Sequence, residues 1–330
     1  MSVKSGSDAT LLHQSEVAPE EIDSLGHMNV RFYIARVVQA NAELLRRAGL
    51  YDSAARDLRV RQVDTYTRFH KEQFVGASLE TLGGFVKPAA GALLEGTAGI
   101  LCYFEIRNAE SGVIAATFLV RSRLFNTVTQ QFLALPPATI WQNSEWAMLV
   151  PEQGLPRSLK MTAPSRLDYA TVDSAVVDNP AIGMMSGRRA GVVRPEDCDD
   201  QGRLKDELDV MFLIARQHME ASELSGDKAF GPPVQTDSQG RRFSWAMMET
   251  RSVQFKRPKL GDSVVSLGAD IAWSEKWRHS RRWTFVAETG ELLGIADSLG
   301  ICIDLDARKA LPIPSELMGE IEQHAVPQFL

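Results

Sequence analysis

Apolar side chains recur at helical spacing directly after a short polar stretch near the start of the chain. One stripe holds Tyr33, Val37, Leu44 and Ala48, and the neighbouring stripe holds Ile34, Val38 and Leu45. Arg36, Glu43 and Arg47 fall on a narrow polar face. Because the apolar arc is wide, the pattern predicts a largely buried helix over residues 29–50, with Gly49 as its C-terminal stop.

A second helix of the same kind is predicted over residues 206–223, where Val210 to Ile214 are apolar in succession. Runs rich in β-branched and aromatic residues, separated by Gly and Asn, follow both helices and predict strands. The predicted strands are 60–74, 77–88, 92–107 and 112–125 in the first half, and 243–256, 262–274, 279–288 and 291–303 in the second.

The chain also repeats itself in sequence. Residues 17–26 read VAPEEIDSLG and residues 193–202 read VRPEDCDDQG, each shortly before a predicted helix. Each half is therefore a strand, a turn, a long helix and a meander of about four strands. We expect a first domain over 1–140, a second over 188–330, and a proline-containing linker over 141–187 that packs on the sheets.

A buried helix wrapped by an antiparallel meander is the hot-dog architecture. The predicted fold class is thus α+β, with two tandem hot-dog domains, each an antiparallel sheet around a long central helix.

Composition and charge exclude several classes of binding partner. The 330 residues carry a net charge of −6, which gives no broad cationic surface and argues against a nucleic acid partner. Three separated cysteines, Cys102, Cys198 and Cys302, suggest neither disulfides nor a zinc site. No long apolar stretch, signal peptide or GxGxxG turn is present, so we expect a cytoplasmic protein with no membrane partner, cofactor or metal.

Three of the four candidate catalytic residues lie in the turn before the first helix, and the fourth, Glu72, lies on the predicted strand 60–74. Helix N-termini favour negative charge, so this turn could stabilise an oxyanion. Asp23 or Glu72 could activate water or attack a carbonyl, and His27 and Asn29 could position water and carbonyl. Each residue also has a plain structural reading: Asp23 and Asn29 as helix caps, His27 as a partly buried histidine, and Glu72 as a solvated strand residue.

The segment IDSLGHMNVRFYIARV, residues 22–37, resembles the signature of the 4-hydroxybenzoyl-CoA thioesterase-like family. The segment RFHKEQFVGASLE, residues 68–80, looks like the family strand that carries a Glu before a Gly, and the acyl-ACP thioesterases have a similar turn and Glu. The resemblance implies catalytic roles for Asp23, His27, Asn29 and Glu72, and substrate contacts for Gly26, Met28 and Tyr33. Val30 stands where the family usually has a second Asn.

The resemblance implies hydrolysis of an acyl thioester, and the absence of an evident basic docking face favours acyl-CoA over acyl-ACP as the partner. A non-catalytic acyl or acyl-CoA binding protein is the alternative, and an (R)-enoyl-CoA hydratase ranks below both. In the second half, Arg203, Lys205 and Arg257 replace His27, Asn29 and Glu72, so we expect one active site per chain. A homo-oligomer of tandem units remains possible.

One further segment has two readings. Residues 273–283, WSEKWRHSRRW, could contact CoA phosphates and adenine, or could form an exposed hairpin tip. The sequence favours the hairpin tip.

Overall fold

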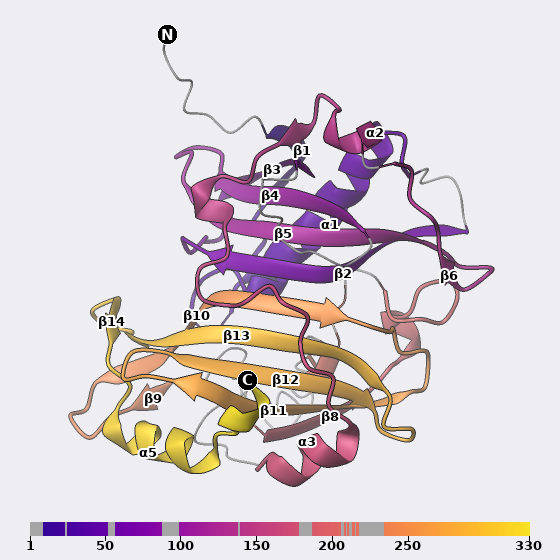
Figure 1. Cartoon of the computed structure of the whole chain (residues 1–330). Coiled ribbons are helices and arrows are strands. Elements are labelled where there is room, and N and C mark those ends of the chain that lie inside the picture. Colours follow the sequence, from indigo (N-terminus) through magenta and orange to yellow (C-terminus); the bar gives the residue numbers. More distant parts are fainter. Residues whose placement is uncertain are drawn as a thin grey trace. The chain divides into compact units, whose positions relative to one another are not determined.

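The structure is a computed structural model, and it describes residues 9–23, 25–51, 57–87, 99–137, 139–177, 187–205, 208, 210, 213–214, 216–217 and 234–330. The described chain divides into two compact units. Unit 1 runs to residue 162, and unit 2 comprises residues from 163 onward together with the short segment 23–26. Both units are drawn in Figure 1, and each is described here by itself.

Unit 1 is an antiparallel sheet with a long helix against it. Its five main strands lie in the order β1-β3-β4-β5-β2, and α1 packs against β1, β3 and β4 (Figure 1). The main elements are β1 (Thr10–Glu16), α1 (Val30–Arg47), β2 (Leu58–Phe69), β3 (Ser78–Val86), β4 (Ile100–Asn108) and β5 (Ile114–Asn126). The short elements are η1 (Pro19–Glu21), β6 (Gln131–Phe132), α2 (Thr139–Gln142), β7 (Ala147–Met148) and η2 (Glu152–Gly154).

The amphipathic pattern explains why α1 sits where it does. Its buried apolar side chains join one core with residues from the sheet, among them Tyr33, Val37, Leu44, Phe85, Phe104 and Phe118. Gly49 follows the helix with φ +67°, the left-handed conformation that ends helices and that glycine adopts without strain. The first predicted helix is confirmed, and unit 1 has the hot-dog architecture expected of it.

Unit 2 repeats the strand order of unit 1. Its main strands lie as β8-β11-β12-β13-β10, which places β8, β11, β12, β13 and β10 where unit 1 has β1, β3, β4, β5 and β2. These strands are β8 (Gly187–Val192), β10 (Arg242–Gln254), β11 (Ser263–Trp273), β12 (Arg278–Val286) and β13 (Leu292–Asp304). The remaining elements are α3 (Tyr169–Ala175), η4 (Pro195–Asp197), β9 (Gln235–Thr236), β14 (Lys309–Leu311), α5 (Ser315–His324) and η5 (Pro327–Phe329).

The predicted helix over 206–223 lies mostly outside the described residues. Leu213 and Ile214, which the structure does describe, are helical and pack in a core with Val264 and Val286. The start of the strand predicted at 92–107 also falls outside, because residues 88–98 are not described.

The segment predicted as a linker packs on sheet residues of each unit. In unit 1, β7 pairs with β3 in parallel, and Arg68 donates hydrogen bonds to the carbonyls of Gln153 and Leu155 at 3.0 and 3.1 Å. In unit 2, the Tyr169 ring of α3 meets Phe285 edge-on at a centroid distance of 5.4 Å.

Gly154 shows how tightly this segment fits unit 1. A Cβ at this position would lie 2.3 Å from Cε2 of Tyr103, a buried ring that cannot move aside easily. We expect Gly154→Ala to lower the free energy of unfolding by about 1–3 kcal/mol through overpacking. Gly319→Ala in α5 is the control, because nothing lies within 4 Å of its Cβ. Chemical denaturation should show that Gly319→Ala raises the free energy of unfolding by about 0.5–1 kcal/mol. Equal changes in this free energy for the two variants would contradict the prediction.

The favoured reading of residues 273–283 as a hairpin tip holds only for residues 274–277, which form the exposed turn between β11 and β12. Arg278, Arg282 and Trp283 are buried in unit 2, and the ring of Trp245 lies 3.8 Å from the Arg278 guanidinium. Arg281 donates to Asp297 at 2.7 Å and to the Phe329 carbonyl at 2.6 Å. These three arginines have partners inside the unit, so residues 278–283 are part of strand β12, and for them the hairpin-tip reading is wrong.

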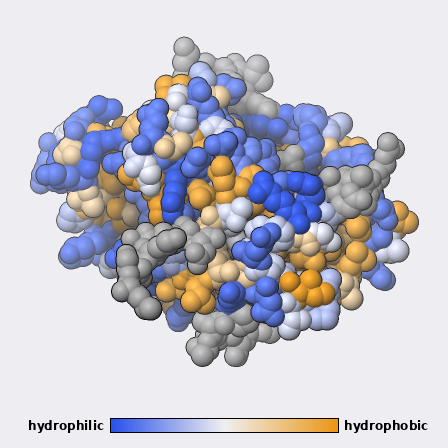
Figure 2. Space-filling view, turned by 90° about the horizontal axis from the view of Figure 1, so that it is seen from above, coloured by the Kyte–Doolittle hydropathy of each residue, from blue (hydrophilic) through white to orange (hydrophobic). Residues whose placement is uncertain are grey.

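None of the helices in the described part of the chain has the length and apolarity needed to cross a membrane. The face shown in Figure 2 mixes hydrophilic residues with small hydrophobic groups.

Candidate active site

The candidate site is built on a tight loop that precedes α1. An isolated β-bridge between Ile22 and Met28 closes the loop, and the Asp23 carboxylate accepts a hydrogen bond from the Leu25 amide at 2.9 Å. Gly26 has φ +83°, a conformation that other residues adopt only with strain, and no atom lies within 4 Å of a Cβ built on it. The loop therefore needs glycine for its backbone, and the space beside Gly26 is open.

The loop leads directly into the helix. Asn29 is the N-cap of α1, and its side-chain oxygen accepts a hydrogen bond from the Arg31 amide at 3.1 Å. Asn29 therefore caps the helix, as its structural interpretation predicted, while its proposed role in positioning the carbonyl or water stays a prediction. Met28 and Tyr33 are buried in the core of unit 1, and the Tyr33 ring packs edge-on against Phe69. Their predicted substrate contacts also stay predictions.

The structure brings the side chains of His27 and Glu72 together. His27 Nε2 lies 3.5 Å from Glu72 Oε1, with 16% of the His27 side chain and 38% of the Glu72 side chain exposed. Glu72 was expected on a strand, and this is wrong: β2 ends at Phe69, and Glu72 lies in the loop before β3. The partly exposed imidazole and carboxylate can exchange protons with a bound water or substrate.

Arg36 is a supporting residue that sequence reasoning misplaced. It was assigned to the polar face of the helix, but only 5% of it is exposed. Its guanidinium binds the Glu21 carboxylate at 2.7 and 3.1 Å, and also the Ser15 hydroxyl at 2.7 Å. This ion pair joins α1 to η1 and so fixes the start of the loop that carries Asp23 and His27.

The second repeat preserves the backbone of this loop. The Asp199 carboxylate accepts from the Gln201 amide at 2.9 Å, as Asp23 does from Leu25. The Leu204 amide donates to the Pro258 carbonyl at 3.0 Å, as the Met28 amide does to the Gln73 carbonyl at 2.7 Å. Arg216 also binds Asp197, which repeats the pair of Arg36 and Glu21. The Asp–x–x–Gly turn therefore forms with or without the histidine.

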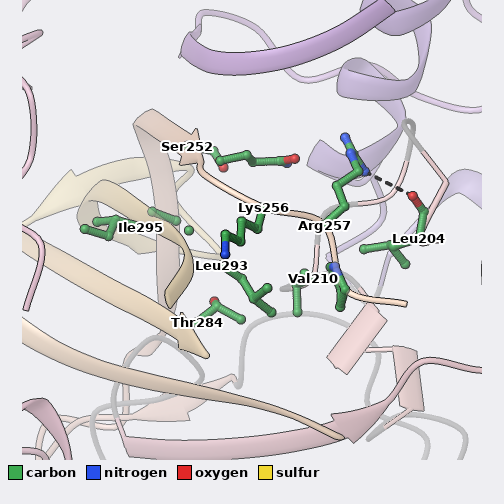
Figure 3. A pocket seen from close by; sticks show the side chains of 12 residues that line it. Leu204, Val210, Ser252, Lys256, Arg257, Thr284, Leu293 and Ile295 are labelled. Atoms are coloured by element: carbon green, nitrogen blue, oxygen red, sulfur yellow. Dashed lines mark hydrogen bonds between the residues drawn. The ribbon is translucent and has the colours of Figure 1, made fainter. Parts of the chain in front are cut away.

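The second repeat has different side chains at the positions equivalent to the proposed catalytic residues. Arg257 stands in the place of Glu72, is buried, and donates to the carbonyls of Lys205 at 2.7 Å and Leu208 at 3.2 Å. The cavity beside it has a volume of about 20 Å³ and is lined in part by Leu204, Thr284, Leu293 and Ile295 (Figure 3). A volume of that size holds one or two waters. The described part of this site offers no carboxylate in place of Glu72.

Within the described residues, no group of three or more His, Cys, Asp or Glu side chains is placed to hold a metal ion.

Comparisons with known proteins find one matching family model and several solved structures with a similar fold. Residues 17–142 match the model of the thioesterase-like superfamily. No curated protein sequence matches the chain. The structure is similar to the 12:0-ACP thioesterase from Umbellularia californica, at 13% identity and a TM-score of 0.60, over 89% of this chain and 94% of that one.

Two further solved structures show the same likeness. A putative oleoyl thioesterase from Lactobacillus plantarum has 12% identity and a TM-score of 0.58, over 89% of this chain and 96% of that one. An acyl-ACP thioesterase from Bacteroides thetaiotaomicron has 10% identity and a TM-score of 0.53, over 89% of this chain and 98% of that one. These similarities extend over both halves, and the predicted tandem hot-dog fold is confirmed.

Proposed function

We propose that this chain, whose residues 17–142 match the model of the thioesterase-like superfamily and whose fold is a tandem hot-dog, hydrolyses an acyl thioester, with acyl-CoA as the favoured substrate. The observation that carries the proposal is the pair of His27 and Glu72, 3.5 Å apart beside the start of a buried helix. An acyl-ACP is the second candidate substrate, because two of the similar structures are named for acyl-ACP thioesters.

The proposed reaction needs an attacking oxygen and a place for negative charge. Asp23 acts as the base that removes a proton from water, or as the nucleophile itself. The oxygen adds to the thioester carbonyl carbon, and the resulting oxyanion is stabilised at the positive end of the α1 dipole. The C–S bond then breaks, and the thiol leaves with a proton. When water is the attacking group the free acid forms directly, and when Asp23 attacks, a water molecule then hydrolyses the acyl–Asp23 anhydride to release the acid and restore the carboxylate.

The other proposed side chains position the reactants. Asn29 and His27 orient the carbonyl and the water, and Glu72 supports His27 from across the gap of 3.5 Å. Open space beside Gly26 gives the thioester room to approach the main chain. Met28 and Tyr33 shape the apolar wall from within the core.

The direct test is a panel of acyl-CoAs and acyl-ACPs of varied acyl length, assayed by release of free thiol with a thiol-reactive dye. We expect release from acyl-CoA that is proportional to enzyme concentration and exceeds spontaneous hydrolysis by several orders of magnitude. Faster thiol release from acyl-ACP than from acyl-CoA would make acyl-ACP the preferred substrate. If no thioester is cleaved but calorimetry shows acyl-CoA binding, the chain is a binding protein and the proposed hydrolysis is wrong.

A further inference from the structure

The loop that carries Glu72 is fixed at its start by the main chain. The amides of His70 and Lys71 both donate to the carbonyl of Ala115 on β5, at 2.8 and 3.1 Å. The second repeat has the same arrangement, since the amides of Phe255 and Lys256 both donate to the carbonyl of Leu293. This attachment therefore belongs to the fold and not to the chemistry.

The end of the loop is fixed by a side chain. Gln73 is buried, with 3% of it exposed, and its Nε2 donates to the main-chain carbonyl of Glu72 at 2.9 Å. Its Oε1 accepts from Asn108 Nδ2 at 3.1 Å. The Asn108 side-chain oxygen in turn accepts from the amide and the hydroxyl of Ser111, both at 3.0 Å. The β4–β5 turn is thus connected to the loop through two buried or half-buried amides.

We infer that Gln73 and Asn108 are positioning residues, which hold the Glu72 carboxylate at its distance from His27. The inference rests on the proposed function. Gln73 is suited to the task because its main-chain carbonyl also accepts the hydrogen bond of the Met28 amide at 2.7 Å. One residue therefore binds both the loop of Glu72 and the loop of His27.

The second repeat supports this assignment from within the same chain. Pro258 stands in the place of Gln73, and its carbonyl still accepts from the Leu204 amide at 3.0 Å. Val286 stands in the place of Asn108, and its carbonyl still accepts from the Gly290 amide at 2.9 Å, as the Asn108 carbonyl does from Gly112. The main chain is kept while both side-chain amides are lost, in the repeat that has also lost the histidine and the glutamate.

The physical reason lies in the exposure of Glu72. With 38% of its side chain exposed, packing alone gives the carboxylate little constraint. Its position then depends on the main chain that carries it. A displacement of about 1 Å in a reacting group can cost a hundredfold in rate. A buried amide that fixes the loop is therefore worth far more to turnover than to stability.

The test is a pair of substitutions that break the network at different points. Gln73→Met removes both amide contacts at similar volume, and Asn108→Ser is too short to reach Gln73 but keeps a turn-forming oxygen. We expect each to lower kcat roughly tenfold to a hundredfold, with KM changed less than about threefold. Asn126→Ser is the matched control: the Asn126 side-chain oxygen, like that of Asn108, accepts two hydrogen bonds within its turn, here from the amides of Val128 and Thr129, and no described contact joins it to Gln73. It should leave kcat unchanged.

A double-mutant cycle separates positioning from general destabilisation. In a Glu72→Gln background, Gln73→Met should add less than about twofold, because the carboxylate it positions is gone. Hydrogen exchange should show faster exchange of the Met28 amide in Gln73→Met. Full additivity, or unchanged kcat in both single variants, overturns the inference while hydrolysis by the parent leaves the proposed function standing. A parent that cleaves no thioester overturns both.

Discussion

Asp23→Asn should lower kcat by at least about a hundredfold with little change in KM, which is the usual scale for losing a catalytic base. Asparagine keeps a side-chain oxygen, so the bond from the Leu25 amide and the turn itself should survive. What is lost is the negative charge that activates water. Steady-state kinetics on the best acyl-CoA measures the loss, and an unchanged melting temperature shows that the fold is intact.

The second repeat supplies the matched control for this experiment. Asp199→Asn alters the same turn, with the same bond to the amide two residues on, in a loop that lacks the histidine and glutamate. It should leave kcat within about twofold. An equal loss in both variants would contradict a single active site per chain. If Asp23→Asn keeps most activity while Glu72→Gln abolishes it, Glu72 is the base and Asp23 only forms the turn.

Arg36→Met should lower the free energy of unfolding by about 3–5 kcal/mol. The substitution keeps an apolar stem of similar length, but it leaves the Glu21 carboxylate, 14% exposed, without its bidentate partner. Removing one member of a buried pair is costly because the other charge remains in a poorly solvated place. Urea denaturation followed by circular dichroism measures the change.

Arg46→Met is the control for this effect. Arg46 also pairs with a carboxylate at 2.7 Å, that of Glu43, but half of its side chain is exposed. Surface pairs of this kind contribute at most about 1 kcal/mol. Comparable losses in the two variants would mean that burial does not set the strength of the Arg36 pair.

The strands were predictable because their pattern is local. The second half was expected to have strands at 243–256 and 262–274, and the structure has Arg242–Gln254 and Ser263–Trp273. Runs of β-branched and aromatic residues bounded by Gly were sufficient for this. The end of β2 was missed, because the amides of His70 and Lys71 turn toward Ala115, a residue far along the chain. The burial of Arg36 and Arg282 was missed for the same reason, because it depends on partners that are distant in sequence and that residue spacing does not reveal.

The candidate site was predicted in part. The sequence placed His27 and Glu72 in one site, and the structure has them 3.5 Å apart. It left the capping role of Asn29 open, and the cap is present. Gln73 and Asn108 were missed, although the register of the repeat already set Gln73 against Pro258. The signal was that the second repeat has a proline at the position equivalent to Gln73, because a proline cannot make the hydrogen bonds that a glutamine side chain makes.

Duplication has left the two loops with different freedom to evolve. If the proposed reaction takes place at the first loop, substitutions at His27 or Glu72 are exposed to selection for turnover. In the second, Arg203 and Lys205 bear no such constraint, so new side chains can be tried there without loss of the proposed reaction. Arg257 is constrained in another way, because its buried guanidinium donates to the main-chain carbonyls of Lys205 and Leu208. We therefore expect sequence change to be tolerated better at positions 203 and 205, whose side chains donate one hydrogen bond each to a main-chain carbonyl, than at position 257.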